Sequence, residues 1–167
     1  AKGVYTETGS WSDTGNPGFA YRTKTIRDTE NPFRAGTART AKTSDKAAKA
    51  PVAGWSAEFP EAGEYAVYVS YQTLPNSAPD ALYRVNSKEC TREFRLNQNM
   101  GGGTWIYLGH FSFDKGRQDK PVVELVGQSS HRGKAVSADA VKIGGGMGNV
   151  ARKVKEGDPS IDYQYMT

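Results

Sequence analysis

Four carboxylates keep acid–base chemistry open, because a pair of carboxylates flanking a sugar ring is the arrangement that hydrolyses glycosidic bonds. They fall on different predicted strands, and carboxylates at such spacings are ordinary in a domain of this length. Asp139 is the most informative, since its neighbours in Ser-Ala-Asp-Ala-Val are small or apolar. A buried carboxylate needs a hydrogen-bond donor or a cation, and we expect a structural hydrogen bond there rather than a metal. The four residues are Glu58, Asp80, Glu93 and Asp139.

Two other motifs resemble pieces of a catalytic or nucleotide-binding site. Ser129-Ser130-His131 offers hydroxyls beside an imidazole, but adjacent side chains rarely point at one another, and the glycines of a nucleophile turn are missing. The glycine run from Gly144 follows a predicted strand, yet Asn149 stands where a dinucleotide fingerprint needs its third glycine. One cysteine and two histidines are also a poor supply for zinc. We therefore predict no catalytic residues, no cofactor and no metal.

Exposed aromatic residues are the better candidates for binding. Trp11 is flanked by serines and turn residues, so we predict an exposed indole, which suits the face of a sugar ring. Tyr21 and Lys42 complete the predicted ligand-binding set, and the loops around Trp11, Pro75 and Lys42 are where we expect a ligand. Trp55 belongs to an alternating apolar strand, which predicts core packing instead.

Charge is concentrated in the first third of the chain. The net charge is +4, but residues 21–50 hold eight basic residues against three acidic ones. We predict that residues 37–51 are a flexible basic insertion loop, with a strand over residues 34–41 as the alternative reading of its beginning. Because no aromatic residue is interleaved through this loop to stack on bases, we predict no nucleic-acid partner. No apolar run is long enough to cross a bilayer, and no signal sequence opens the chain at Ala1, so any export signal is expected outside it.

Size and composition favour one all-β domain. A chain of 167 residues fits a single domain with an ordinary core, and 19 glycines, nine tyrosines and eight prolines are typical of short strands joined by turns. Periodicity predicts a β-sandwich, with a closed barrel as the alternative. The predicted strands, besides those discussed next, cover residues 34–41, 81–86, 90–98, 121–127 and 135–143.

Two strand predictions organise the rest. Residues 104–113 alternate as one apolar face, and three glycines precede them, which predicts a strand inside a sheet with its tryptophan in the core. Residues 52–59 and 64–72 also alternate around a Pro-Glu-Ala-Gly turn, which predicts a hairpin. The predicted structural core is made of Trp55, Tyr65, Val67, Trp105, Phe111 and Asp139.

Several of these stretches, read together, resemble the golvesin C-terminal-like domain, also called the xanthan-lyase-associated domain. They are PEAGEYAVYV from Pro60, DALYRV from Asp80, NQ at Asn97, GTW from Gly103 with LG at Leu108, and ADAV from Ala138. Each is weak alone and specific in this order, over roughly residues 9–143. The resemblance implies a non-catalytic, jelly-roll-like antiparallel β-sandwich, similar to carbohydrate-binding modules, over residues 1–149. Residues 150–167 are then a charged tail or linker.

The resemblance also implies a function. Such domains are carried by secreted, cell-surface or periplasmic bacterial enzymes that act on polysaccharide or peptidoglycan, and the GGGMGN stretch from Gly144 looks like versions attached to amidase-like cell-wall hydrolases. We therefore expect an accessory module that binds glycan weakly beside a catalytic domain in the same polypeptide. The alternative is a structural domain that positions that neighbour and binds no ligand. An independent hydrolase is the third reading.

Overall fold

The computed structural model describes residues 4–17 and 37–144, and almost all of its regular structure is antiparallel strand. A short 3-10 turn, η2 (Ala47–Lys49), follows the third strand. The strands, in chain order, are β1 (Val4–Thr8), β2 (Trp11–Pro17), β3 (Thr37–Lys42), β4 (Val52–Ser56), β5 (Glu58–Phe59), β6 (Gly63–Ser70), β7 (Ala81–Asn86), β8 (Thr91–Leu96), β9 (Ile106–Phe113), β10 (Gly116–Arg117), β11 (Val123–Val126), β12 (Ala135–Ala138) and β13 (Ala140–Ile143).

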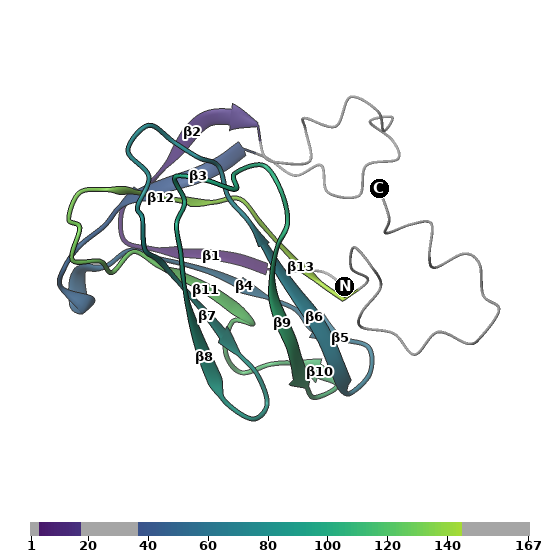
Figure 1. Ribbon diagram of the computed structural model, residues 1–167. Helices are drawn as coiled ribbons and strands as arrows, with labels where there is room; N and C mark the ends of the chain where they lie inside the picture. The colour runs from purple at the N-terminus through teal and green to yellow at the C-terminus, as the bar shows by residue number, and fades with distance from the viewer. Residues whose placement is uncertain (1–3, 18–36, 145–167) are drawn as a thin grey trace, which may run out of the picture.

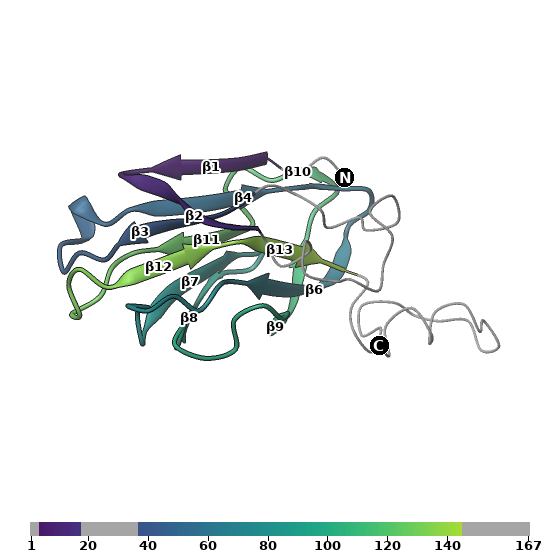
Figure 2. The same cartoon turned by 90° about the horizontal axis from the view of Figure 1, so that it is seen from above.

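These strands form a β-sandwich (Figure 1). One layer is a five-stranded sheet in the order β1-β4-β11-β7-β8. The other consists of two three-stranded sheets, β12-β3-β2 and β13-β6-β9, which are joined because β12 and β13 follow each other with only Asp139 between them (Figure 2). A small ribbon of β10 and β5 closes one end. The prediction of an all-β, single-domain sandwich is confirmed.

The core lies between the two layers and draws on both. Tyr83 on β7 and Leu125 on β11 come from the five-stranded sheet, and Val67 on β6 and Phe113 on β9 come from the opposite layer; all are at most 1% exposed. Phe59 stacks on Phe113 with ring centroids 4.4 Å apart. Burying large apolar side chains of this kind contributes about 2 kcal/mol each, so packing between the layers is what holds the sandwich together.

The predicted hairpin is wrong in its pairing, although both of its strands exist. β4 pairs with β1 and β11 in the five-stranded sheet, whereas β6 pairs with β13 and β9 in the other layer. The turn between β5 and β6 therefore crosses from one layer to the other. Alternation indicates which face of a strand is buried, not which strand pairs with it. The predicted hairpin and the observed pairing bury the same faces, so the pattern does not distinguish them.

β9 also differs from its prediction, in place and in facing. It begins at Ile106 rather than residue 104, and it lies at the edge of its sheet. Its register with β6 shifts at a bulge, where Val67 faces Gly109 while Tyr68 faces Tyr107. An extra residue in a strand moves the following side chains to the other face. The buried positions of β9 are Leu108 at the bulge, and Phe111 and Phe113 after it.

The bulge overturns the prediction that Trp105 lies in the core. Trp105 and Tyr107 fall on the side of β9 opposite to Leu108, so they face outward. Tyr107 is 48% exposed, and Trp105 is half-buried outside the core cluster, with the Lys142 ammonium 5.9 Å from its ring centroid. Gly109 has φ +136°, a conformation that suits glycine and marks the bulge.

The predicted insertion loop is wrong for its first residues. Residues 37–42 are β3, which lies between β12 and β2 and buries Ala38 and Ala41. The alternative reading, a strand over residues 34–41, is the correct one for the described part of that range. The segment after β3 is tied down by backbone hydrogen bonds, including Thr43 N to Lys134 O at 2.8 Å and Ser44 N to Gly127 O at 2.9 Å.

Tyr21 and the predicted tail over residues 150–167 lie outside the described residues. Within the described residues, no helix has the length and apolar character that a membrane crossing requires.

Candidate functional site

A groove of about 760 Å³ lies where β2, β3 and the start of β12 meet the loop after β6. Its walls carry the hydroxyl side chains of Ser10, Ser12, Thr14 and Thr40, together with Asn76. Because β2 pairs with β3, and β3 with β12, in antiparallel register, alternate side chains of these strands point out of the sandwich into this space. The groove therefore combines short polar side chains held on a sheet with a larger apolar surface, to which Trp11, Pro51 and Leu74 contribute.

The groove brings together three sequence-predicted positions. Trp11, Lys42 and Pro75 all line it, although they come from β2, β3 and the loop after β6. These three segments are far apart in the sequence. The part of the chain that the structure describes thus gathers the predicted Trp11 and Lys42, while Tyr21 is not placed.

Trp11 is less exposed than predicted. Its side chain is half-buried and packs against the core, and its indole N–H donates to Thr8 O at 3.0 Å. Trp11 pairs with Ala41 on β3, which in turn pairs with Val136 on β12, so it belongs to the inward row of this sheet. Trp11 therefore shapes the wall of the groove rather than presenting a free ring face.

Two lysines line the groove from different elements. Lys42 ends β3 opposite Ala135 of β12, and Lys49 ends the η2 turn. Both side chains are exposed. A third ammonium, that of Lys134, donates to Asn76 Oδ1 at 3.0 Å at the border of the groove. The groove is thus basic.

An ion pair joins β3, which lines the groove, to the opposite layer of the sandwich. Arg39 on β3 donates from Nε to Glu7 Oε1 at 2.7 Å and from Nη2 to Oε2 at 3.0 Å. Tyr5 also donates its hydroxyl to Glu7 Oε1 at 2.9 Å. The hydrogen bond from Arg39 is the main reason that the pKa of Glu7 is lowered, with burial opposing it. The pair ties β3 to β1 across the sandwich.

A second candidate surface is the outer face of β13, β6 and β9, which sequence reasoning missed. Lys142, Tyr68 and Tyr107 lie in one row across these strands, with the Lys142 ammonium 5.5 Å from the Tyr68 ring centroid. Tyr68 itself is buried, at 3% exposed. Burial lowers the pKa of Lys142 and raises that of Tyr68. We call this row the aromatic face. An isolated glycine inside a predicted strand, Gly109, was the signal that could have revealed it.

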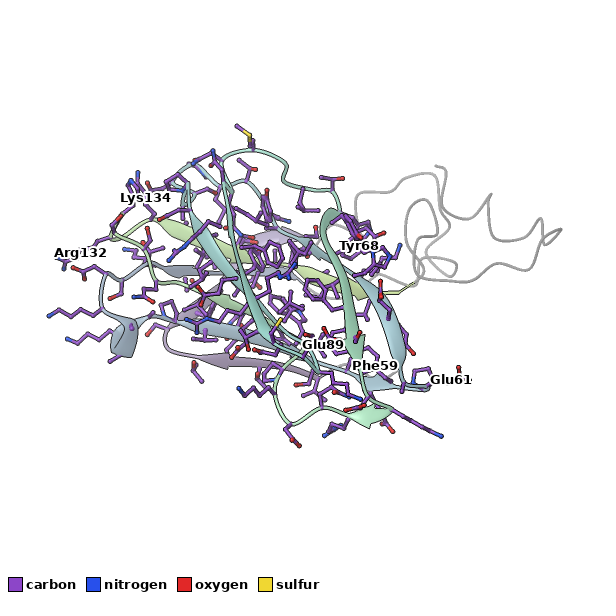
Figure 3. All side chains as sticks on the ribbon, turned by 60° about the horizontal axis from the view of Figure 1, so that its bottom comes forward. Phe59, Glu61, Tyr68, Glu89, Arg132 and Lys134 are labelled. Atoms are coloured by element: carbon purple, nitrogen blue, oxygen red, sulfur yellow. The ribbon has the colours of Figure 1, made fainter. Side chains whose placement is uncertain are left out.

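The aromatic face and the groove lie apart. In Figure 3, Arg132 and Lys134 stand at one end of the sandwich and Tyr68 toward the other. Tyr107 hydrogen-bonds to His110 Nδ1, and its ring lies 5.3 Å from that of Tyr68, measured between centroids. The rings are thus packed on one another, which leaves Tyr107 as the exposed aromatic of this face.

The hydroxyl and imidazole of the serine–histidine motif do not form a nucleophile and base. Ser129 is 4% exposed and donates its hydroxyl to Asp80 Oδ1 at 2.6 Å, while His131 donates its backbone N–H to Ser129 Oγ at 2.9 Å. The imidazole Nδ1 is 3.6 Å from Asp80 Oδ1 instead. A serine bound to a carboxylate in this way stabilises a loop and is not activated by a base.

Of the remaining predicted carboxylates, Glu58 is exposed on β5, and the other two are engaged separately. Glu93 pairs with Arg84 at 2.8 Å on the edge of the five-stranded sheet. Asp139 is half-buried at the break between β12 and β13 and accepts from the Ser70 hydroxyl at 3.4 Å. No group of three or more potential metal ligands occurs among the described residues.

The residues predicted for the core differ in how far their side chains are buried. Val67 and Phe111 belong to it, whereas Trp55 and Tyr65 are half-buried and pack against it. Trp55 also contacts Tyr5 on β1, with ring centroids 5.4 Å apart.

Comparison with known proteins gives one family and one related structure. The model of the Golvesin C-terminal domain matches residues 27–145. A search of curated proteins gives no match. Among solved structures, a Paenibacillus xanthan lyase is similar with a TM-score of 0.57 and 25% identity over 83% of this chain. The similarity covers 12% of the lyase chain.

Proposed function

This chain belongs to the Golvesin C-terminal domain family, and from that premise we propose that it is a non-catalytic accessory domain of a secreted bacterial enzyme acting on polysaccharide or peptidoglycan. In this proposal the groove binds the glycan weakly. A catalytic domain elsewhere in the same polypeptide performs the chemistry, outside the cell or at its surface.

Two findings support the accessory role. The family match covers most of the chain, and the similar structure is a xanthan lyase of which a domain like this one makes up 12%. A sandwich that forms so small a share of an enzyme is suited to targeting rather than to turnover. Ser129, His131, Asp80, Glu93 and Asp139, which could have offered chemistry, are engaged in structural contacts.

The groove is the observation that carries glycan binding. Its walls combine serine and threonine hydroxyls, an amide and lysines with the apolar edges of Leu74 and Pro75. Sugars present hydroxyls around apolar ring faces, and short polar side chains on a rigid sheet match them with little loss of side-chain entropy. An open site of this kind gives weak binding, because water competes for each hydrogen bond.

Affinity electrophoresis of this chain through gels that contain single polysaccharides, and pull-down on peptidoglycan sacculi, test the proposal. A Ser12→Tyr variant fills the groove from an exposed position on β2 and is expected to abolish retention. Ala62→Tyr is the matched control, because Ala62 is exposed in the turn before β6, outside the groove. Thermal unfolding of both variants checks that the fold is kept.

Retention that survives Ser12→Tyr would move the site away from the groove. No retention on any glycan would overturn binding and favour a domain that only positions its catalytic neighbour. The parent enzyme with and without this segment separates these roles: lower activity on the polymer alone indicates targeting, and lower activity on a soluble small substrate as well indicates positioning.

A further inference from the structure

The basic character of the groove leads beyond glycan binding in general. Lys42 and Lys49 line it from β3 and from η2, and neither forms an ion pair within residues 4–17 and 37–144. Two exposed ammonium groups at one wall raise the local positive potential, which attracts anions.

The nearby carboxylates do not neutralise these lysines. Asp13, the acidic residue among the described groove residues, accepts the backbone N–H of Gly15 at 2.7 Å. Glu7 is held by Arg39 from two sides. Asp45 lies 3.4 Å from Arg132, measured between Oδ1 and Nε. Glu7 and Asp45 thus face arginines, whereas Asp13 keeps its negative charge, so the two lysines leave the groove lining with a net charge of +1.

We propose that the groove selects anionic glycans, and that Lys42 and Lys49 hold the carboxylate of an acidic sugar residue. The inference rests on the proposed function and names its ligand class. Lysine suits this task, because its ammonium is a point charge on a flexible stem and accepts carboxylates at varied positions along a polymer. The hydroxyl wall of β2 and β3 then contacts the sugar hydroxyls next to that carboxylate.

Exposed charge pairs of this kind are individually weak and are screened by salt. Removing one lysine is expected to weaken binding by about threefold, and removing both by about tenfold. Raising the salt concentration from about 0.05 M to 0.5 M is expected to weaken binding to a similar extent, because the Debye length shortens over that range.

The test compares polygalacturonate with its methyl ester, since these two polymers share a backbone and differ in charge. Retention in affinity electrophoresis and titration calorimetry are measured for the full chain and for Lys42→Gln, Lys49→Gln and the double variant. Lys115→Gln with Lys120→Gln removes two charges from exposed positions that do not line the groove and serves as the matched control. Thermal unfolding confirms that each variant folds.

Preference for polygalacturonate that is lost in the Lys42/Lys49 variant and kept in the Lys115/Lys120 variant supports the proposal. Equal binding of the acid and its ester, insensitive to salt, overturns the selectivity and leaves glycan binding intact. Equal loss in both double variants also overturns it, because net charge rather than the groove is then responsible. Absence of binding to either polymer and to the wider glycan panel overturns the proposed function itself.

Discussion

Gln98 and Ser137 exchange two hydrogen bonds inside the core. Gln98 Nε2 donates to Ser137 O at 3.0 Å, and Ser137 N donates to Gln98 Oε1 at 2.8 Å. The Gln98 side-chain amide thereby supplies the backbone hydrogen bonds that a neighbouring strand would give to β12. It also donates to the Tyr83 hydroxyl at 2.9 Å, across to the opposite layer. Gln98 and Ser137 are fully buried, so this contact satisfies backbone groups that have no access to water.

We expect Gln98→Leu to lower the free energy of unfolding by about 3 kcal/mol, because it leaves the buried N–H and C=O of Ser137 without partners. Urea denaturation measures the change. Gln118→Leu is the control, since within the described residues the Gln118 amide donates to the backbone carbonyls of Asp114 and Gly116, neither of which is buried, and we expect a loss below about 1 kcal/mol. Equal losses in the two variants would contradict the bridging role of Gln98.

The bulge in β9 depends on Gly109. Its φ of +136° is rarely adopted by other residues, and a side chain there meets the Phe111 ring at 3.4 Å. Gly109→Ala is expected to cost about 2 kcal/mol of stability. Gly63→Ala on the adjacent strand is the comparison, because its added methyl finds only the Tyr65 ring, at 4.0 Å. A Gly109→Ala protein as stable as the Gly63→Ala protein would mean that the bulge tolerates side chains.

The Glu7–Arg39 pair makes stability depend on pH in the acid range. The pKa of Glu7 is lower in the folded protein than in the unfolded chain, mainly because Arg39 donates to it. The folded state therefore gains stability above the unfolded pKa, about 4.3, and loses it as pH falls through the folded pKa. We expect Glu7→Gln to lower Tm near pH 7 and the difference from the unmodified protein to shrink toward pH 3.

The exposed Arg84–Glu93 pair offers a control for that measurement, since its carboxylate is 53% exposed. Glu93→Gln is expected to change Tm much less at every pH, because exposed ion pairs are weak. A Glu7→Gln difference that stays constant from pH 7 to pH 3 would show that lost packing rather than charge is responsible.

A substitution of Tyr107 tests whether glycan binds at the aromatic face or in the groove. Its side chain is largely exposed and contacts Tyr68 and His110, so we expect Tyr107→Ala to cost about 1 kcal/mol or less and to leave glycan retention unchanged. Affinity electrophoresis beside the Ser12→Tyr variant gives the comparison. Loss of retention in Tyr107→Ala with normal retention in Ser12→Tyr would place binding on the aromatic face.

Sequence patterns predicted the strands themselves better than they predicted which strands pair with one another. The strand predicted over residues 81–86 coincides with β7, which is buried at five of its six positions and reads as a short apolar run. Neither an apolar run nor alternation indicates pairing, so β4 and β6 were joined into one hairpin although they lie in different layers. Trp105 was misplaced for a related reason: an extra residue at Leu108–Gly109 reverses the pattern, and only the glycine hints at it.

The groove was predicted in part. Trp11, Lys42 and Pro75 were singled out one by one for exposure or charge, and the fold brings them together. Lys49 was missed as a site residue, because the sequence of its segment predicts a flexible loop. The backbone hydrogen bonds that hold this segment to residues 127–134 are not visible in the sequence. Thr43 N to Lys134 O and Ser129 N to Ser44 O are such contacts, each joining positions more than 80 residues apart.

The strand pair β12–β13 has a mechanical consequence. β12 forms four residue pairs with β3, and β13 forms four with β6, on either side of Asp139. A pull along β13 is directed along the strand axis, so it loads these ladders in shear, and their hydrogen bonds must fail together rather than one after another. Resistance to force is set by the rate of unfolding under load. The fold is thus suited to staying intact when the chain is pulled along β13.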